Sequence, residues 1–181
     1  MSPPANPRLR PRRCDRISLA ALVSAPGNSR RFVRQVCERW GVPGDQSETV
    51  QLLTSELVTN AVEETGILEP HPEYGVVHAG ATLIRVVLLE FAHSLVVEVW
   101  DSSFEPPKLA KPDSDSERGR GLQLVDTLSR RWGYYPARAG KVVWCELSLR
   151  SGPPADGWDR DPDTLRRVLG ALQLLALDEE P

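Results

Sequence analysis

The chain has 181 residues, a formal net charge of -3 and 40% apolar side chains. This length and composition predict one globular domain with tails, and they exclude wholesale disorder. The small net charge gives no general electrostatic reason to bind nucleic acid. No secretory signal pattern and no apolar run of roughly 18 residues is present, so we expect no membrane span. Three cysteines without a C-x-x-C pair argue against a disulfide framework, and we expect a cytoplasmic protein.

Proline and arginine dominate residues 1–16, which have few apolar side chains and are therefore expected to form a disordered N-terminal tail. Apolar periodicity then predicts a strand at 17–24, helices at 26–40 and 46–64, and a hairpin formed by strands at 82–91 and 94–100. A third helix is predicted at 119–131, followed by two further strands at 133–135 and 141–149. Asp45 and Glu48 are spaced as an N-cap and its capping-box partner for the second helix. The polar, proline-rich segment 101–118 is expected to be a loop or a lid.

Helices interrupted by strand pairs predict an α+β fold, namely a two-layer α/β sandwich in which a mixed sheet is covered on one face by helices. Residues 150–181 are expected to form a linker and a C-terminal amphipathic helix, which at about 14 residues is too short to span a bilayer. This helix has two interpretations that the sequence leaves open. It packs on its own domain, or it lies in a groove of a partner.

Three separated stretches hold residue types suited to a nucleotide site. Glu56 and Asn60 are four residues apart in an expected helix, so a carboxylate and a carboxamide share one face. Asp101 ends an apolar strand-like run. Gly119 and Gly121 begin a helix-like run, where backbone N–H groups can approach phosphates. Each residue also has a purely structural interpretation. Glu56 could be a solvated helix carboxylate, and Asn60 a polar residue near a helix end. Asp101 could begin a turn at the end of a strand, and the two glycines could be needed only for packing.

The segments ELVTNA (56–61), WDSS (100–103) and GRGLQLV (119–125) resemble, in this order, the N, G1 and G2 boxes of the histidine-kinase-like ATPase family. This is the GHKL or Bergerat-fold family, and the closest likeness is to its small anti-sigma factor serine/threonine kinases. The resemblance covers about residues 17–149 and implies that they form an ATP-binding domain, with ATP and Mg²⁺ as cofactors.

The same resemblance implies a role for each matching residue. Asn60 corresponds to the Mg²⁺ ligand, a neutral oxygen donor suited to a hard cation. Glu56 corresponds to the residue that positions or deprotonates the attacking hydroxyl. Asp101 would accept a hydrogen bond from the exocyclic amine of adenine, which would disfavour guanine. The remaining ATP-binding candidates are Ser103, Arg118, Gly119, Arg120, Gly121 and Leu122.

Two positions depart from the family pattern. The N box usually has a basic residue four positions after its Asn, whereas this chain has Glu64. A carboxylate there would oppose the phosphates unless it points to solvent. The G1 box usually has Gly two positions after its Asp, whereas this chain has Ser103, which puts a close backbone approach at that point in doubt.

The resemblance implies an ATP-dependent regulator that binds a sigma factor and phosphorylates a serine of an anti-sigma antagonist. The two departures motivate an alternative, a catalytically weak or inactive partner-switching module that regulates by protein–protein interaction. A third class, the ATPase part of a chaperone or topoisomerase, lacks the length for a transducer domain. The resemblance also implies a homodimer as one assembly state, for which no residue pattern gives independent support.

Overall fold

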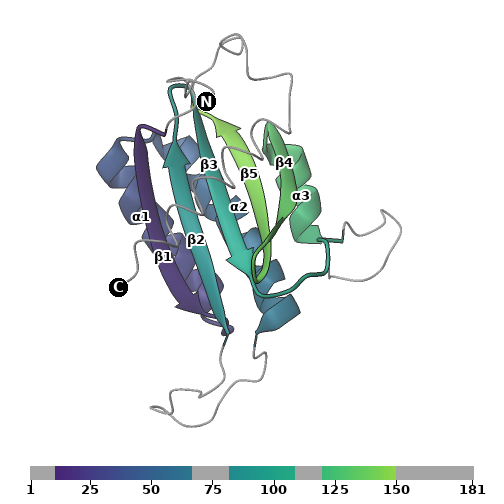
Figure 1. Cartoon of the computed structure of the whole chain (residues 1–181). Helices are drawn as coiled ribbons and strands as arrows, with labels where there is room; N and C mark the ends of the chain where they lie inside the picture. Colours follow the sequence, from purple (N-terminus) through teal and green to yellow (C-terminus); the bar gives the residue numbers. More distant parts are fainter. Residues whose placement is uncertain (1–10, 67–81, 109–119, 150–181) are drawn as a thin grey trace, which may run out of the picture.

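The order of helices and strands follows the sequence expectation closely. The structure is a computed structural model and describes residues 11–66, 82–108 and 120–149 (Figure 1). Its elements in chain order are β1 (Arg13–Ala20), α1 (Ala25–Trp40), α2 (Gly44–Thr65), β2 (Leu83–Glu90), β3 (Ser94–Asp101), α3 (Arg120–Leu128), β4 (Arg131–Ala137) and β5 (Gly140–Ser148). The expected disordered residues 1–10 and the expected linker and helix in 150–181 lie outside the described residues.

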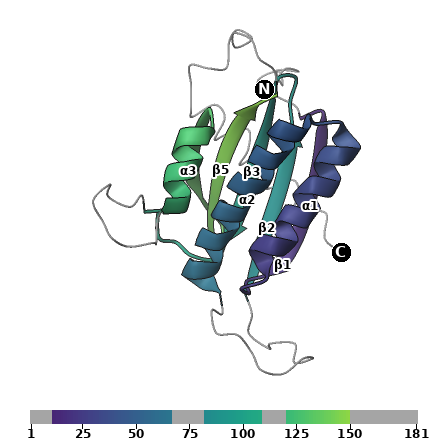
Figure 2. The ribbon, with the colours of Figure 1, turned by 180° about the vertical axis from the view of Figure 1, so that it is seen from behind.

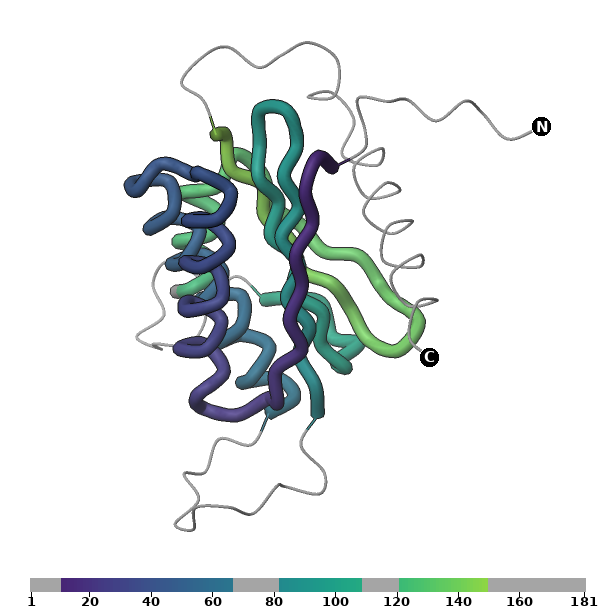
Figure 3. Tube along the Cα trace, turned by 90° about the vertical axis from the view of Figure 1, so that its left-hand side faces the viewer, coloured from purple at the N-terminus to yellow at the C-terminus, as the bar shows by residue number. Residues whose placement is uncertain are grey.

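The five strands form one sheet in the order β1-β2-β3-β5-β4. All three helices lie on one face of this sheet, with α2 between α1 and α3 (Figure 2). The tube view shows the same two layers from the side (Figure 3). The expected α+β two-layer sandwich is therefore confirmed.

The strand directions differ from the expected mixed sheet, because each of the four neighbouring pairs is antiparallel. The order in which the chain connects the strands explains why all four pairs are antiparallel. β2 and β3 form one hairpin, and β4 and β5 form a second. The connection through α3 and β4 returns β5 to the other side of β3 in the opposite direction. No parallel crossover is then needed among the described strands.

Alternate residues of the central strands form the core beneath the helices. Leu95, Val97 and Val99 of β3 belong to the main apolar cluster together with Leu57 of α2 and Val143 of β5. Each of these side chains is almost fully buried. A buried side chain of this size contributes about 1.5–3 kcal/mol. Because strand side chains alternate, Asp101 of β3 and Lys141 of β5 face the same layer as these apolar residues.

The first strand begins earlier than the sequence indicates, since residues 13–16 pair with β2 instead of lying in a tail. Long polar side chains hold this early part. The Nε atom of Arg13 lies 2.6 Å from Oε2 of Glu90, and its Nη1 donates to the carbonyl oxygen of Trp40 at 2.9 Å. Charged side chains with aliphatic stems can therefore extend an edge strand where an apolar pattern ends.

The start of α2 also differs from expectation. Pro43 is the N-cap residue and makes no side-chain capping bond, while Asp45 lies inside the first turn. The expected capping box between Asp45 and Glu48 was therefore wrong. An acidic residue in the first turn still interacts favourably with the positive end of the helix dipole. Within the described part of the chain, no helix combines the length and apolarity needed to cross a bilayer.

Candidate functional site

One face of α2 carries three polar residues at intervals of four: Glu56, Asn60 and Glu64. This spacing aligns their side chains along the helix. α2 packs against α3 and also against β3. The residues from the second and third candidate stretches can therefore reach α2 from two neighbouring elements.

Glu56 lies against the first turn of α3. A Cβ atom added at Gly121 would lie 2.5 Å from Oε2 of Glu56, so the missing side chain of Gly121 leaves the space beside this carboxylate. Burial raises the pKa of Glu56 above its ordinary value, Glu63 adds to the increase, and Arg30 opposes it. A carboxylate with a raised pKa accepts a proton more readily than an exposed one.

Asn60 lies one turn further along α2 and is half-buried. Its Nδ2 atom is buried and has no hydrogen-bond partner in the part of the chain that the structure describes. Rotation of the amide exchanges its nitrogen and oxygen, so the same position can present an oxygen to a hard cation. No group of three or more His, Cys, Asp or Glu side chains is placed for a metal among the described residues. A Mg²⁺ ion at Asn60 would therefore take its other ligands from phosphates and water.

Asp101 ends β3 and is 1% exposed. Its Oδ1 accepts hydrogen bonds from the backbone N–H of Ser103 at 2.8 Å and from Nζ of Lys141 at 3.0 Å. Its Oδ2 is buried without a partner among the residues described. Burial raises the pKa of Asp101, although Lys141 and Ser103 oppose the increase, and Glu64 adds to it. Desolvation outweighs the ion pair at this carboxylate.

Ser103 connects the end of β3 to the last turn of α2, because its Oγ donates to Oε2 of Glu64 at 3.5 Å. The same Oγ accepts a hydrogen bond from the backbone N–H of Glu105 at 3.1 Å. Glu64 is exposed at this position. α3 thus meets α2 at Glu56, and the segment after β3 meets α2 at Glu64.

The structure describes the remaining ATP-binding candidates only in part. Leu122 is 2% exposed and belongs to the main core cluster, so packing accounts for it and a contact with ATP remains a prediction. Arg120 is the first residue of α3, and its side chain is not described. Arg118 and Gly119 lie outside the described residues, so the glycine pair can be followed only at Gly121.

Lys141 is a site residue that no pattern in the sequence indicated. Its side chain is buried and forms an ion pair with Asp101, the residue opposite it where β3 pairs with β5. A lysine at the start of an apolar strand usually carries its charge into solvent. The alignment of two strands 40 residues apart in the sequence could have revealed this pair, but a single sequence does not supply it.

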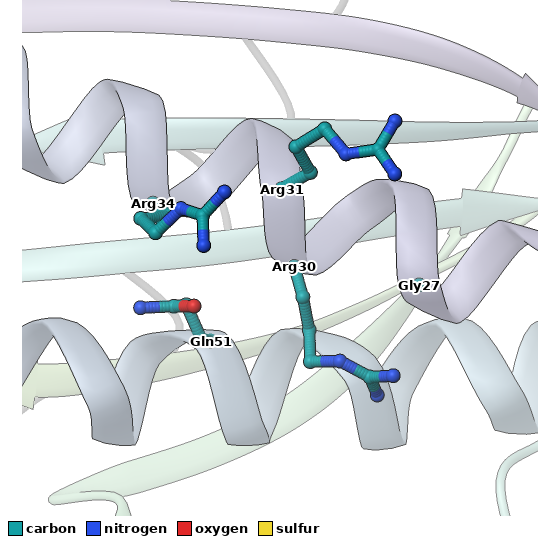
Figure 4. Close-up of a pocket in the computed structure, with 5 residues that line it drawn as sticks. All are labelled: Gly27, Arg30, Arg31, Arg34 and Gln51. Carbon is teal, nitrogen blue, oxygen red and sulfur yellow. The ribbon is translucent and has the colours of Figure 1, made fainter.

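A second missed feature is a groove of about 300 Å³ beside α1, lined by Gly27, Arg30, Arg31, Arg34 and Gln51. Figure 4 shows Arg30 extending from α1 toward α2, whereas Arg31 leaves α1 on the other side. Arg30 is also close enough to Glu56 to affect the pKa of that carboxyl. The helical spacing of the three arginines was visible in the sequence, but their position relative to Glu56 was not.

Comparison with protein families gives a match over most of the described residues. Residues 19–146, more than half of the chain, match the family described as the histidine kinase-like ATPase domain. No curated protein matches the chain closely enough to serve as a relative. The match covers β2, β3 and β4 completely, most of β5 and the last two residues of β1, and it includes Glu56, Asn60, Asp101 and Gly121. The chain belongs to the histidine kinase-like ATPase domain family.

Proposed function

We propose that this protein binds Mg-ATP along the polar face of α2 and transfers the γ-phosphate to a serine of a partner protein, as anti-sigma factor serine/threonine kinases do. The observation that carries the proposal is that the second and third candidate stretches meet α2, the helix that carries the first. Gly121 lies against Glu56, and the segment after Asp101 reaches the last turn of the helix through Ser103. Family membership supports the nucleotide, and the raised pKa of Glu56 supports the transfer.

In the proposed reaction, the serine hydroxyl oxygen attacks the γ-phosphorus. A new O–P bond forms, and the bond between the γ-phosphorus and the β,γ-bridging oxygen breaks to release ADP. Glu56 takes the proton of the hydroxyl, for which its raised pKa suits it. Asn60 would hold Mg²⁺, which when bound neutralises charge on the phosphates. Asp101 would hold the adenine amine through Oδ2, which has no partner among the described residues.

The arginine groove supports a protein substrate. Arg30, Arg31 and Arg34 line it from α1, and Arg30 also influences Glu56. Guanidinium groups pair well with carboxylates, so the groove suits an acidic segment next to the phosphorylated serine. We propose an anti-sigma antagonist as the phosphorylated partner and a sigma factor as the regulated one. The cytoplasm is then the compartment in which the proposed complex acts.

Nucleotide binding is tested by calorimetric titration with ATP in the presence and absence of Mg²⁺. Asn60→Ala is expected to weaken Mg-ATP binding by about tenfold or more, because a metal ligand is lost. The defect should disappear in EDTA, where wild type and variant should bind alike. Gln51→Ala is the matched control, since it removes a carboxamide from the same helix outside the polar face. A wild-type protein that binds no ATP, or an equal defect in EDTA, would contradict the assignment.

Phosphoryl transfer is tested by incubating the full chain with γ-labelled Mg-ATP and an anti-sigma antagonist protein from the same organism. Label should appear on a serine of the antagonist and should depend on both proteins. Retained ATP binding without label on any antagonist tried would remove the kinase assignment and leave the nucleotide site intact.

Gly121→Ala should change the geometry of the site while leaving the stability of the fold almost unchanged. The new Cβ would lie 2.5 Å from Oε2 of Glu56, the mobile end of that side chain, so the carboxylate should move. Helical propensity favours Ala over Gly, but Gly121 is only the second residue of α3 and the added Cβ would also lie 3.3 Å from Cβ of Glu56, so the free energy of unfolding should change by no more than about 1 kcal/mol. We expect the transfer rate to fall by about tenfold or more, because a misplaced base loses its geometry. Gly44→Ala at the start of α2, where no atom of the described residues lies within 4 Å of the added Cβ, is the control for both rate and urea denaturation.

The contact between Ser103 and Glu64 favours a second candidate function, an ATP-binding partner-switching module with little or no catalysis. A carboxylate lies where the family usually has a basic residue, and it adds to the raised pKa of Asp101. Such a module would be stabilised by ATP according to the ratio of nucleotide concentration to Kd. It would keep its regulatory effect on transcription in a Glu56→Ala variant, whereas the kinase would lose it.

A further inference from the structure

The end of the sheet beside α2 contains an ion pair that is withdrawn from water. Nζ of Lys141 lies 3.0 Å from Oδ1 of Asp101, and each residue is 1% exposed. Lysine is almost never fully buried unless it is paired. The two residues are partners in the β3–β5 register, and both face the helix layer. Lys141 therefore belongs to the same corner of the fold as the proposed adenine contact.

The backbone is built to bring these two residues together. Gly140 has a φ of 140°, and a Cβ atom added there would lie 2.0 Å from the carbonyl oxygen of Asp101. Only glycine tolerates both this conformation and this approach. The tight contact places the start of β5 against the end of β3, so Lys141 enters beside Asp101 instead of extending into solvent.

The pair has hydrogen-bonding capacity left over. Oδ1 of Asp101 already accepts from Ser103 and from Lys141, whereas Oδ2 has no partner among the described residues. The ammonium group of Lys141 has three N–H bonds, and one of them is directed at Asp101. A buried acceptor without a donor destabilises the state that contains it. A ligand that offers a donor to Oδ2 and an acceptor to Nζ would satisfy both groups.

Building on the proposed ATP binding, we propose that Lys141 is a second base-reading residue, which donates from Nζ to ring nitrogen N1 of adenine while Oδ2 of Asp101 accepts from the exocyclic amine. Adenine presents this donor and this acceptor side by side on its Watson–Crick edge. Guanine presents the reverse order, with an acceptor oxygen at position 6 and an N–H at position 1. In the same orientation, the guanine oxygen would face the carboxylate of Asp101 and the guanine N–H would face the ammonium group of Lys141. Neither contact is a hydrogen bond, so the site should discriminate strongly against guanine.

The test compares nucleotides that differ by one atom, using calorimetric titration of the full chain. 1-Deaza-ATP keeps the amine but replaces N1 by C–H. Wild type is expected to bind it about tenfold or more weakly than ATP, as expected for a lost hydrogen bond to a charged donor. Lys141→Met should bind the two nucleotides with equal affinity. 7-Deaza-ATP, which keeps both N1 and the amine, is the control ligand and should bind wild type about as ATP does.

Equal binding of ATP and 1-deaza-ATP by wild type would overturn this inference and leave ATP binding standing. A tenfold loss that persists unchanged in Lys141→Met would also overturn it, because the atom that reads N1 would then be another one. Failure of wild type to bind ATP at all would overturn the proposed function and this inference together. Equal binding of the two nucleotides by wild type would overturn the inference even if Lys141→Met does not fold.

Discussion

Glu56→Gln is expected to lower the rate of phosphoryl transfer to the antagonist by about 10²- to 10⁴-fold, the usual contribution of a positioned general base. Glutamine keeps the length of the side chain and its place beside Gly121, but it cannot take the proton of the serine hydroxyl. The affinity for ATP should stay within about twofold, because the loss acts on the transition state and not on nucleotide binding. Single-turnover transfer from labelled ATP measures the rate, and calorimetry measures the affinity.

The pH dependence of the same reaction gives a second measure of Glu56. Burial raises the pKa of this carboxyl, and only its ionised form can act as a base. The wild-type rate should therefore fall as pH decreases through that raised pKa, whereas the residual rate of Glu56→Gln should not show this step. Glu48→Gln, an exposed change on the same helix, should leave rate and pH profile unchanged. A Glu56→Gln variant as active as Glu48→Gln would exclude Glu56 as the base.

Local patterns in the sequence predicted most of the helical layer. The apolar spacing located α1 and α2 within about two residues of their ends, and the i, i+4 relation between Glu56 and Asn60 correctly placed both on one helix. These features depend on residues that are close in the sequence. A helix fixes the relative positions of such residues whatever the rest of the chain does.

Sequence patterns did not predict the features that depend on a contact with a distant part of the chain. Arg13, the first residue of β1, is held by Glu90 and Trp40, which no local pattern connects to it. The burial of Lys141 depends on its register opposite Asp101 and on the close approach of Gly140. Long-range pairing of this kind is fixed by the tertiary fold, so a single sequence gives little sign of it.

Asp101→Asn is expected to lower the free energy of unfolding by about 3–5 kcal/mol, the usual cost of leaving one charge of a buried pair without its partner. Asparagine keeps an oxygen for Ser103 and for Lys141, but the ammonium group loses its counter-charge. Urea denaturation followed by circular dichroism measures the change. Asp15→Asn is the matched control, because Asp15 pairs at 2.7 Å with the exposed Arg39 and such surface pairs contribute about 0–1 kcal/mol. Equal, small losses in both variants would show that the Asp101 pair is solvated.

Lys141→Met should also destabilise the fold, but by an amount that depends on pH. Lys141 opposes the increase in the pKa of Asp101, so its removal should raise that pKa further. A carboxyl with a folded-state pKa above its unfolded value adds stability at low pH, and this stability is lost as pH rises through the folded-state pKa. The variant should therefore be closer to wild type below the raised pKa of Asp101, where this carboxyl is protonated, and further from wild type above it.

The double variant Asp101→Asn, Lys141→Met completes the cycle for this pair. It removes both charges of the pair and leaves neither side chain as an unpaired buried ion, so its loss of stability should be smaller than the sum of the two single losses by about 0.5–3 kcal/mol. A buried pair replaced by neutral groups often costs little, because the desolvation of two charges is avoided as well. If the double variant is nearly as stable as wild type yet no longer distinguishes ATP from 1-deaza-ATP, the pair is retained for nucleotide recognition and not for the stability of the sheet. Additive losses would instead mean that the two side chains act independently.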